Sequence, residues 1–283
     1  MIANSSQFRL KNGKEYGMIA KKEGSNVATI CILGSCAGTE PMPNRNHTSW
    51  TLSVGDKLYF FDTGECCSWT AHRLGLDLLQ TRAIFISHVH HDHTAGLAGL
   101  MENIRALIYK KKMPLATDDL QLYIPELDVW ENVYQFLKYT TDGHKTAYTI
   151  TAEEPKPGVF YNDGAVKVSA FETLHMKKTE DGRCRSFAYR IETEGKTIVF
   201  SGDIRELAEL TPVIGEGCDV LLCETGHHSV KAVCDFAENA GVKKLVFVHN
   251  GREILNGKPT VREAIDNCAI AAVISEDGMR IEV

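Results

Sequence analysis

The segment from His88 to His93 reads H-V-H-H-D-H and directly follows an apolar run that ends at Ser87. Its imidazoles and carboxylate predict a metal site, because these groups are ligands of zinc and also of manganese or iron. A chain with this cluster must fold so that the flanking segments form a corner in which several of the side chains aim at one point. His91 occupies a spacer position, and we expect it to face solvent.

Short β-type runs recur along the chain, and helical patterns separate some of them. We predict strands at residues 27–33, 49–54, 57–62, 83–87, 120–124, 165–173, 186–192, 197–201, 220–223, 244–248 and 272–275. We predict helices at residues 70–79, from 95 onward, at 127–139 and at 230–240, and a connection through Pro155 and Pro157. This pattern indicates an α/β fold with two sheets and outer helices.

Four of the predicted strands lead into a potential metal ligand. These ligands are His88, His175, Asp203 and His249. Side chains at the end of a strand are held more rigidly than those on a free loop. Each one alone is weak evidence, but their recurrence at strand ends predicts that they share one site with the 88–93 cluster.

Composition limits the class of protein. With 43% hydrophobic residues and no internal repeat or linker, we predict a single domain over residues 1–283. A net charge of −6 argues against a surface built for duplex DNA. Residues 1–24 lack the apolar core of a secretion signal, and no stretch is long enough to span a membrane, so we expect a cytoplasmic protein.

The cysteines are odd in number, at nine, which favours free thiols over a disulfide framework. The adjacent Cys66 and Cys67 could form a reactive or metal-binding pair, and the sequence leaves their role open. No cysteine is assigned to the chemistry.

The order H-x-H-x-D-H, then His, Asp and His across residues 88–249 closely resembles the metallo-β-lactamase superfamily. The resemblance implies an αββα four-layer sandwich that binds two divalent metal ions, zinc first and manganese or iron as alternatives. It distributes the ligands as follows: His88, His90 and His175 on one metal, Asp92, His93 and His249 on the other, and Asp203 bridging both.

Within the superfamily, the chain most resembles ribonuclease Z and related phosphodiesterases. The resemblance rests on residues 33–35 with 43–46, 61–65, 186–192 with 195–203, and 224–229. It implies that His228 donates a proton to the leaving group and that Glu224 orients His228. It also implies a homodimer.

Three differences from known members of the superfamily narrow the range of expected activities. His90 stands where di-iron redox relatives carry Glu, which favours hydrolysis, and Asp203 stands where true β-lactamases carry other ligands. Only eleven residues separate Glu192 from Ile204, so the arm with which ribonuclease Z grips tRNA is missing. This absence argues against tRNA processing.

The leading hypothesis is a phosphodiesterase that acts on RNA ends or on a small nucleotide ester, through a hydroxide between two metals. Asp92 could accept the proton of this nucleophile while binding one metal. A second hypothesis keeps the metals and cleaves a carboxylic ester, thioester or lactone. A third is a metal-bound sensing or binding protein without turnover. A basic loop could receive phosphate or be a solvated face, and it contains Lys177, Lys178, Arg183 and Arg185.

Overall fold

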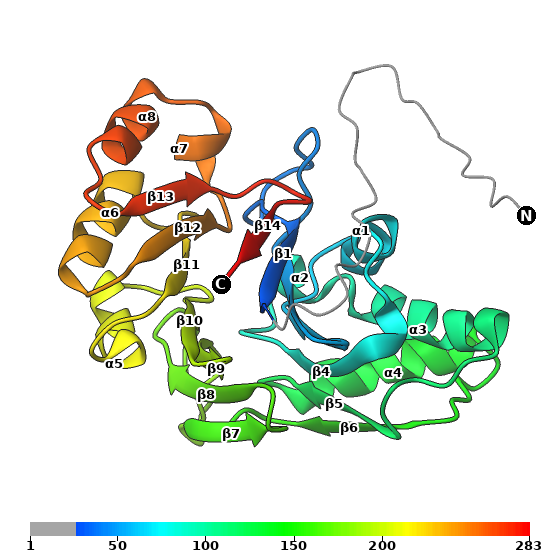
Figure 1. The fold of residues 1–283 in the computed structure, drawn as a ribbon. Helices are drawn as coiled ribbons and strands as arrows, with labels where there is room; N and C mark the ends of the chain where they lie inside the picture. The colour runs from blue at the N-terminus through cyan, green and yellow to red at the C-terminus, as the bar shows by residue number, and fades with distance from the viewer. Residues whose placement is uncertain (1–26) are drawn as a thin grey trace, which may run out of the picture.

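The structure is a computed structural model, and it describes residues 27–283. Two seven-stranded sheets face each other, and helices cover the outer face of each (Figure 1). Buried apolar residues form one cluster between the sheets and one cluster under the helices on each side. The predicted α/β four-layer sandwich is therefore confirmed.

The first sheet has the strand order β14-β1-β2-β3-β4-β5-β6, so within residues 27–283 the last strand pairs with the first. Its strands are β1 (Thr29–Gly34), β2 (Ser49–Val54), β3 (Lys57–Phe61), β4 (Thr81–Phe85), β5 (Asp119–Tyr123), β6 (Thr149–Glu153) and β14 (Arg280–Glu282). From β3 to β6 the strands run parallel, and their carboxyl ends lie along one edge.

The second sheet has the order β13-β12-β11-β10-β9-β8-β7 and is parallel from β10 to β13. Its strands are β7 (Gly158–Asn162), β8 (Lys167–Glu172), β9 (Phe187–Thr193), β10 (Lys196–Phe200), β11 (Val220–Glu224), β12 (Lys244–Val248) and β13 (Ala271–Ile274). The hairpin between β9 and β10 has only Glu194 and Gly195 at its tip, both with positive φ. This turn leaves no room for an inserted arm.

Helices on the first sheet are α1 (Cys67–Arg73), the 3₁₀ turn η1 (Leu78–Gln80), α3 (Leu97–Lys111) and α4 (Leu127–Thr140). Those on the second are η2 (Leu207–Leu210), α5 (Thr211–Ile214), α6 (Val230–Asn239) and α8 (Pro259–Asp266). Two single-turn helices follow strand ends, α2 (His91–Thr94) and α7 (Arg252–Leu255). Figure 1 shows α3 and α4 on one side of the sandwich and α6 and α8 on the other.

Aromatic rings fill the space between the sheets. Trp50 stacks on Phe61 at 4.2 Å between ring centroids, and Phe61 stacks on Phe85 at 4.9 Å. From the opposite sheet, Phe200 meets Trp50 edge-on at 5.5 Å. These side chains are at most 1% exposed, and such dense packing holds the strand ends in fixed relative positions.

The strands predicted at residues 49–54 and 57–62 are present as β2 and β3, and they form a hairpin around Gly55 and Asp56. The helix predicted over residues 70–79 was wrong in its second half, because α1 ends at Arg73 and Gly75 has a φ of 77°. The strand β6 precedes the connection predicted through Pro155 and Pro157, and β7 follows it. Neither strand was predicted. The strand β14 and the helix α8 were also missed.

All nine cysteines are free thiols. Cys66 is exposed and Cys67 is buried, and burial raises the pKa of both, that of Cys67 to about 12. Raised thiol pKa values argue against a reactive pair at neutral pH. No helix within residues 27–283 has the length and apolarity to cross a membrane. The prediction made from residues 1–24 lies outside the described residues.

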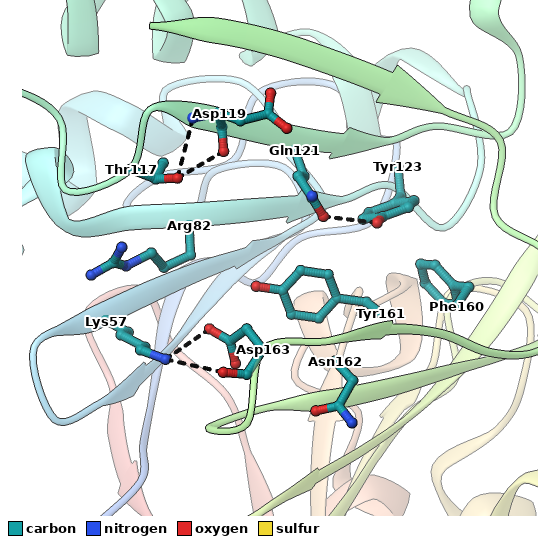
Figure 2. Close-up of a pocket in the computed structure, with 10 residues that line it drawn as sticks. All are labelled: Lys57, Arg82, Thr117, Asp119, Gln121, Tyr123, Phe160, Tyr161, Asn162 and Asp163. Atoms are coloured by element: carbon teal, nitrogen blue, oxygen red, sulfur yellow. Dashed lines mark hydrogen bonds and ion pairs between the residues drawn. The ribbon is translucent and has the colours of Figure 1, made fainter.

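A cavity of about 460 Å³ lies where β3, β4 and β5 begin, between these strands and β7 of the other sheet (Figure 2). Arg82 lines it near the start of β4, and along β5 its lining extends from Asp119 to Tyr123.

Candidate metal centre

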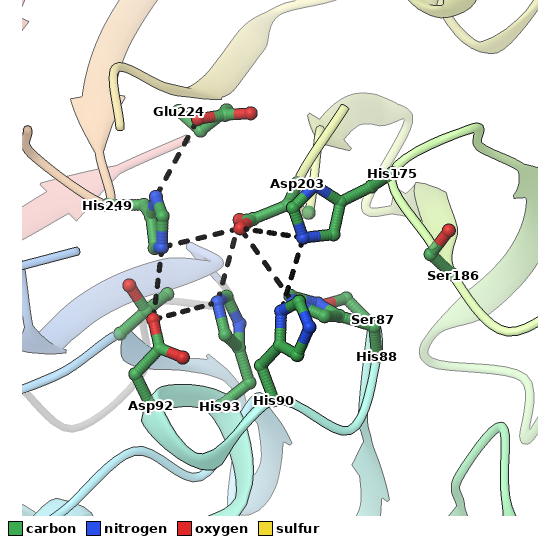
Figure 3. Close-up of polar contacts among 12 residues, drawn as sticks. Ser87, His88, His90, Asp92, His93, His175, Ser186, Asp203, Glu224 and His249 are labelled. Atoms are coloured by element: carbon green, nitrogen blue, oxygen red, sulfur yellow. Dashed lines mark hydrogen bonds and ion pairs between the residues drawn. The ribbon is translucent and has the colours of Figure 1, made fainter. Parts of the chain in front are cut away.

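The potential ligands converge from four segments of the chain (Figure 3). The 88–93 cluster follows β4 and includes the single turn of α2. His175 follows β8, Asp203 follows β10 and His249 follows β12. All seven predicted ligand side chains face one another at this edge of the two sheets, and His91 is exposed, as the sequence predicted.

Three imidazoles form the first group. Nδ1 of His90 lies 2.9 Å from Nε2 of His88 and 3.2 Å from Nε2 of His175. The three ligand atoms lie within 4.8 Å of one another, which allows one metal ion to contact all of them. Burial, together with the neighbouring imidazoles, lowers the pKa of His88 well below its usual value. A neutral imidazole is the form that binds metal.

The second group combines a carboxylate with two imidazoles, all buried. Oδ2 of Asp92 lies 3.2 Å from Nε2 of His249 and 3.4 Å from Nε2 of His93. Burial alone would raise the pKa of the Asp92 carboxyl, but a hydrogen bond from His249 and the charge of the nearby His93 lower it below its usual value. Asp92 is therefore ionised, as a metal ligand must be.

Asp203 lies between the two groups. Its Oδ2 is 3.8 Å from Nε2 of His88 and 3.4 Å from Nε2 of His249, and its Oδ1 is 3.5 Å from Nε2 of His93. The buried Oδ1 of Asp203 and Nε2 of His93 have no hydrogen-bond partner within residues 27–283. Because buried polar atoms normally have a partner, these atoms fit contacts to a bound ion. The donor set of imidazole and carboxylate fits divalent metals such as zinc.

Asp62, which follows β3, is a site residue that the sequence did not single out. It is fully buried, and its Oδ2 accepts hydrogen bonds from Nδ1 of His93 at 2.6 Å and from the Ser87 hydroxyl at 2.8 Å. The Ser87 hydroxyl also lies 3.1 Å from Nδ1 of His88. Asp62 thereby orients one imidazole directly and a second through Ser87, with each Nε2 directed at the site. Its position at the end of a strand beside the 83–87 run was the available signal.

Glu224 lies at the end of β11 and is fully buried. Its Oε1 accepts a hydrogen bond from the Ile204 amide at 3.0 Å, and its Oε2 accepts one from the His227 amide at 2.9 Å. Oε2 also lies 3.7 Å from Nδ1 of His249. Burial raises the pKa of the carboxyl, and contacts from His227 and His249 reverse this effect, so that the net pKa is lowered. Glu224 is thus an anion beneath the site.

The adjacent histidines His227 and His228 lie differently. Nδ1 of His227 is 2.8 Å from Oε2 of Glu224 and 3.8 Å from Oδ2 of Asp203, and its ring centroid lies 4.9 Å from that of His175. Nε2 of His228 lies 3.2 Å from the Ile204 carbonyl and 3.9 Å from Glu224. His227 is therefore closer to the ligand cluster than His228, a difference that two adjacent letters in a sequence cannot reveal.

Two glycines lie against the ligands. A Cβ atom on Gly38 would lie 2.8 Å from Oδ2 of Asp92, and one on Gly226 would lie 2.5 Å from Nδ1 of His249. The backbone at these two positions packs so closely against the ligands that a side chain there would displace the ligand side chain.

The basic loop predicted near His175 is largely neutralised by carboxylates. Lys178 pairs with Glu172 at 2.7 Å, Arg183 with Asp181 at 2.9 Å, and Arg185 with Glu126 at 2.7 Å. These pairs favour the solvated-face interpretation over a phosphate-binding patch.

Comparison with known proteins agrees with this fold. Ribonuclease Z of Methanosarcina mazei is 25% identical, over 90% of this chain and 97% of that protein, and ribonuclease Z of Archaeoglobus fulgidus is 24% identical over the same shares. The crystal structure of the metallo-beta-lactamase fold protein YhfI from Bacillus subtilis matches with a TM-score of 0.71 at 18% identity, over 91% of this chain and 100% of that chain.

The short form of human tRNase Z matches with a TM-score of 0.69 at 20% identity, over 89% of this chain and 98% of that chain. At these identities the solved structures establish the fold alone. The model of the beta-lactamase superfamily domain matches residues 67–250. This match covers well over half of the chain, which therefore belongs to the beta-lactamase superfamily.

Proposed function

We propose that the protein is a metal-dependent phosphodiesterase with two divalent metal ions, and zinc is the metal that we expect first. The observation that carries this proposal is the position of Asp203, whose carboxylate lies within 3.8 Å of imidazoles from both ligand groups. One carboxylate shared by two groups is the arrangement that a bridged metal pair requires. The ribonuclease Z relatives support a phosphodiester as the bond that is cleaved.

The proposed ligands divide as the superfamily pattern implies. One ion belongs to His88, His90 and His175, the other to Asp92, His93 and His249, with Asp203 on both. When bound, two such ions acidify a shared water to generate the nucleophile and neutralise charge on the phosphoryl oxygens. Asp62 holds the imidazole of His93 through a hydrogen bond, so that its ligand nitrogen keeps its direction, and the Glu224 carboxylate lies 3.7 Å from Nδ1 of His249.

Departure of the leaving alkoxide needs a proton donor. The family pattern assigns this role to His228, with Glu224 as the group that orients it. His227 is a second candidate, because its ring is directly hydrogen-bonded to Glu224 and lies nearer to Asp203. Separate His227→Ala and His228→Ala variants, both metal-loaded, distinguish the two. Loss of turnover with a poor alkoxide leaving group, and retention with p-nitrophenolate, is expected for the true donor.

The proposed substrate is an RNA end or a smaller nucleotide ester. The two-residue turn between β9 and β10 carries no tRNA-gripping arm, which favours a substrate that does not need one. A homodimer and a cytoplasmic location remain predictions from the sequence, as does a single domain over the whole chain.

The test begins with protein purified without added metal. Metal content per chain is measured by mass spectrometry, and the same sample is assayed on bis(p-nitrophenyl) phosphate. We expect two metals per chain and phosphodiester turnover. The Asp203→Ala variant should lose the metals and the turnover, and the matched His91→Ala variant should keep the metals and the turnover. Two metals with turnover only of carboxylic esters, thioesters or lactones would move the assignment to the second hypothesis. Two metals without any turnover would support a binding protein, and no metal after reconstitution would refute the site.

A further inference from the structure

The cavity at the start of β3, β4 and β5 is separate from the metal centre. Arg82 contributes to it from the first residues of β4, whereas His88 follows the end of that strand. Six residues of extended chain separate Arg82 from His88 by about 20 Å, whereas Tyr123, at the other end of the cavity, pairs with Phe85 at the carboxyl end of β4. The volume of about 460 Å³ lies in the range of small-molecule sites, roughly 300–1,000 Å³.

Two β-bulges, one in each sheet, supply residues that line this cavity. Between β3 and β4 the register advances from Leu58 opposite Thr81 to Tyr59 opposite Ala83, so Arg82 is the extra residue. Between β7 and β8 the register shifts in the same way around Phe160. A bulge re-aims a side chain at the cost of regular pairing, and bulges are over-represented next to functional sites.

One side of the cavity is aromatic. The ring centroid of Tyr123 lies 4.8 Å from that of Phe160 and 6.0 Å from that of Tyr161, and both pairs meet edge-on. Figure 2 shows Tyr123 and Phe160 at one end of the cavity, opposite Arg82 and Lys57. Tyr123 and Tyr161 are buried in the core between the sheets, whereas Phe160 is only partly buried and is the ring whose surface a planar ligand can reach.

The polar groups of the cavity divide into paired and unpaired ones. Asp163 accepts hydrogen bonds from Lys57 at 3.0 Å and from the Tyr59 hydroxyl at 2.7 Å, and it is therefore engaged. Nε of Arg82 is buried without a partner within residues 27–283, and its Nη1 donates to the Ala116 carbonyl. A guanidinium with a free buried donor invites an acceptor from outside the protein.

Two further groups can take part in recognition. Oδ1 of Asp119 accepts a hydrogen bond from the Thr151 hydroxyl at 2.8 Å, which leaves acceptor capacity on this carboxylate. The side-chain oxygen of Gln121 accepts a hydrogen bond from the Tyr123 hydroxyl at 2.8 Å, which leaves its amide group as a donor. The cavity thus combines a cationic donor, a neutral donor and an anionic acceptor beside an aromatic wall.

We propose that this cavity binds a guanine base. Guanine is planar and offers O6 and N7 as acceptors for an arginine fork, and its N–H groups are donors for a carboxylate. The two cations and two carboxylates of the lining cancel, which favours a neutral base over a multiply charged anion. Adenine presents an amino group where guanine presents O6, and pyrimidines offer a smaller stacking surface.

The experiment titrates guanosine into the full-length protein by isothermal calorimetry, without any turnover. We expect saturable binding, at least about tenfold tighter than that of adenosine or cytidine, because one bidentate contact discriminates by about this factor. Arg82→Ala and Asp119→Asn should each weaken guanosine binding by a similar factor. The matched control is Arg73→Ala, an exposed arginine on α1.

Thermal unfolding followed by circular dichroism shows separately that each variant is folded. If Arg82→Ala does not fold, Asp119→Asn and Arg82→Lys provide the test, and Arg82→Lys should bind guanosine more weakly because it lacks the planar fork. Absence of guanosine binding, equal affinity for all nucleosides, or binding unchanged in the folded variants would overturn the proposal. None of these results depends on the phosphodiesterase assignment.

The guanine could be free or part of an RNA strand. If the guanine lies within an RNA strand, Arg82→Ala should raise KM for a guanosine-containing oligoribonucleotide and leave KM for bis(p-nitrophenyl) phosphate unchanged. If the ligand is a free nucleoside or nucleotide, the protein should bind guanosine, and Arg82→Ala should leave both KM values unchanged. Either result supports a guanine site and assigns its source.

Discussion

Nδ1 of His93 lies 2.6 Å from Oδ2 of Asp62, and because the carboxylate can only accept, the imidazole donates. This hydrogen bond fixes the tautomer of His93 and directs its Nε2 at Asp92 and Asp203. Burial, opposed by the Asp203 and Asp62 carboxylates, leaves the pKa of His93 well above its usual value in the metal-free chain. Metal binding must therefore displace a proton from this residue.

Replacement of Asp62 by Asn should weaken metal binding without removing a ligand. Loss of a carboxylate that orients a ligating imidazole lowers metal affinity by about 10–100-fold. Competition with a chromogenic chelator measures the change. Asp56→Asn, in the exposed turn between β2 and β3, is the matched control and should bind metal like the original protein. Equal affinity in both variants would contradict the role of Asp62.

Removal of metal should lower the melting temperature by several degrees. Buried atoms such as Nε2 of His93 lose their partner when the ion leaves, and an ion that binds only the folded state stabilises it. Differential scanning calorimetry before and after chelation measures the shift. Addition of zinc should restore the original value, and a melting temperature independent of metal would contradict the expectation.

A side chain at position 226 should displace His249. The Cβ of Gly226→Ala would lie 2.5 Å from Nδ1 and 2.6 Å from Cε1 of this imidazole, so the ring must move. We expect weaker metal binding, by about tenfold or more, because the ring also loses its contact with Glu224. Gly99→Ala on α3 is the control, because its Cβ would meet only Ser68 at 3.8 Å. Metal titration followed by mass spectrometry distinguishes the two variants.

The buried His144, after α4, should make stability depend on pH. Burial lowers its pKa below the usual 6.5, against a smaller opposing effect of Glu102. The unfolded chain then binds more protons than the folded one as pH falls through 6.5 toward the lower folded pKa, so stability decreases on acidification. The urea midpoint should fall less in His144→Gln than in the original protein between about pH 7.5 and about pH 5.5. Parallel curves for the two proteins would contradict the prediction.

The aromatic interior should tolerate truncation poorly. Phe61 is fully buried between Trp50 and Phe85, and its replacement by Ala should cost about 3–5 kcal/mol in the free energy of unfolding. Tyr139, at 87% exposure, is the control, and Tyr139→Ala should change stability by less than about 0.5 kcal/mol. Equilibrium unfolding in urea measures both.

The structure brings the seven predicted ligand side chains together, and the sequence could indicate this because four predicted strands lead into the segments that carry them. The hairpin of β2 and β3 was also predictable, since the Gly55-Asp56 turn separates two clear strands. The edge strands β6 and β7 were missed because they are partly exposed, and their residues lack the continuous apolar pattern of the central strands. Three-residue β14 exists only through its pairing with β1, which no local pattern can reveal.

Contacts between distant segments could not be predicted either, because no local sequence pattern reveals them. Asp62 acts on His93 from another strand, and His227 differs from His228 only in direction. The bulges at Arg82 and Phe160 depend on the register of partner strands. In each case the decisive contact joins residues whose proximity is set by the sheets.

The pairing of β14 with β1 has a consequence for the order in which the molecule can be made. Asp277, just before β14, accepts hydrogen bonds from the Ser35 amide at 2.9 Å and from the Asn46 amide at 2.6 Å. The loop that carries Gly38 against Asp92 therefore gains one of its anchors from a segment more than 230 residues downstream of it. A chain synthesised only as far as β11 has neither His249 nor the edge strand β14, so the metal site cannot be complete until both of these segments have been made.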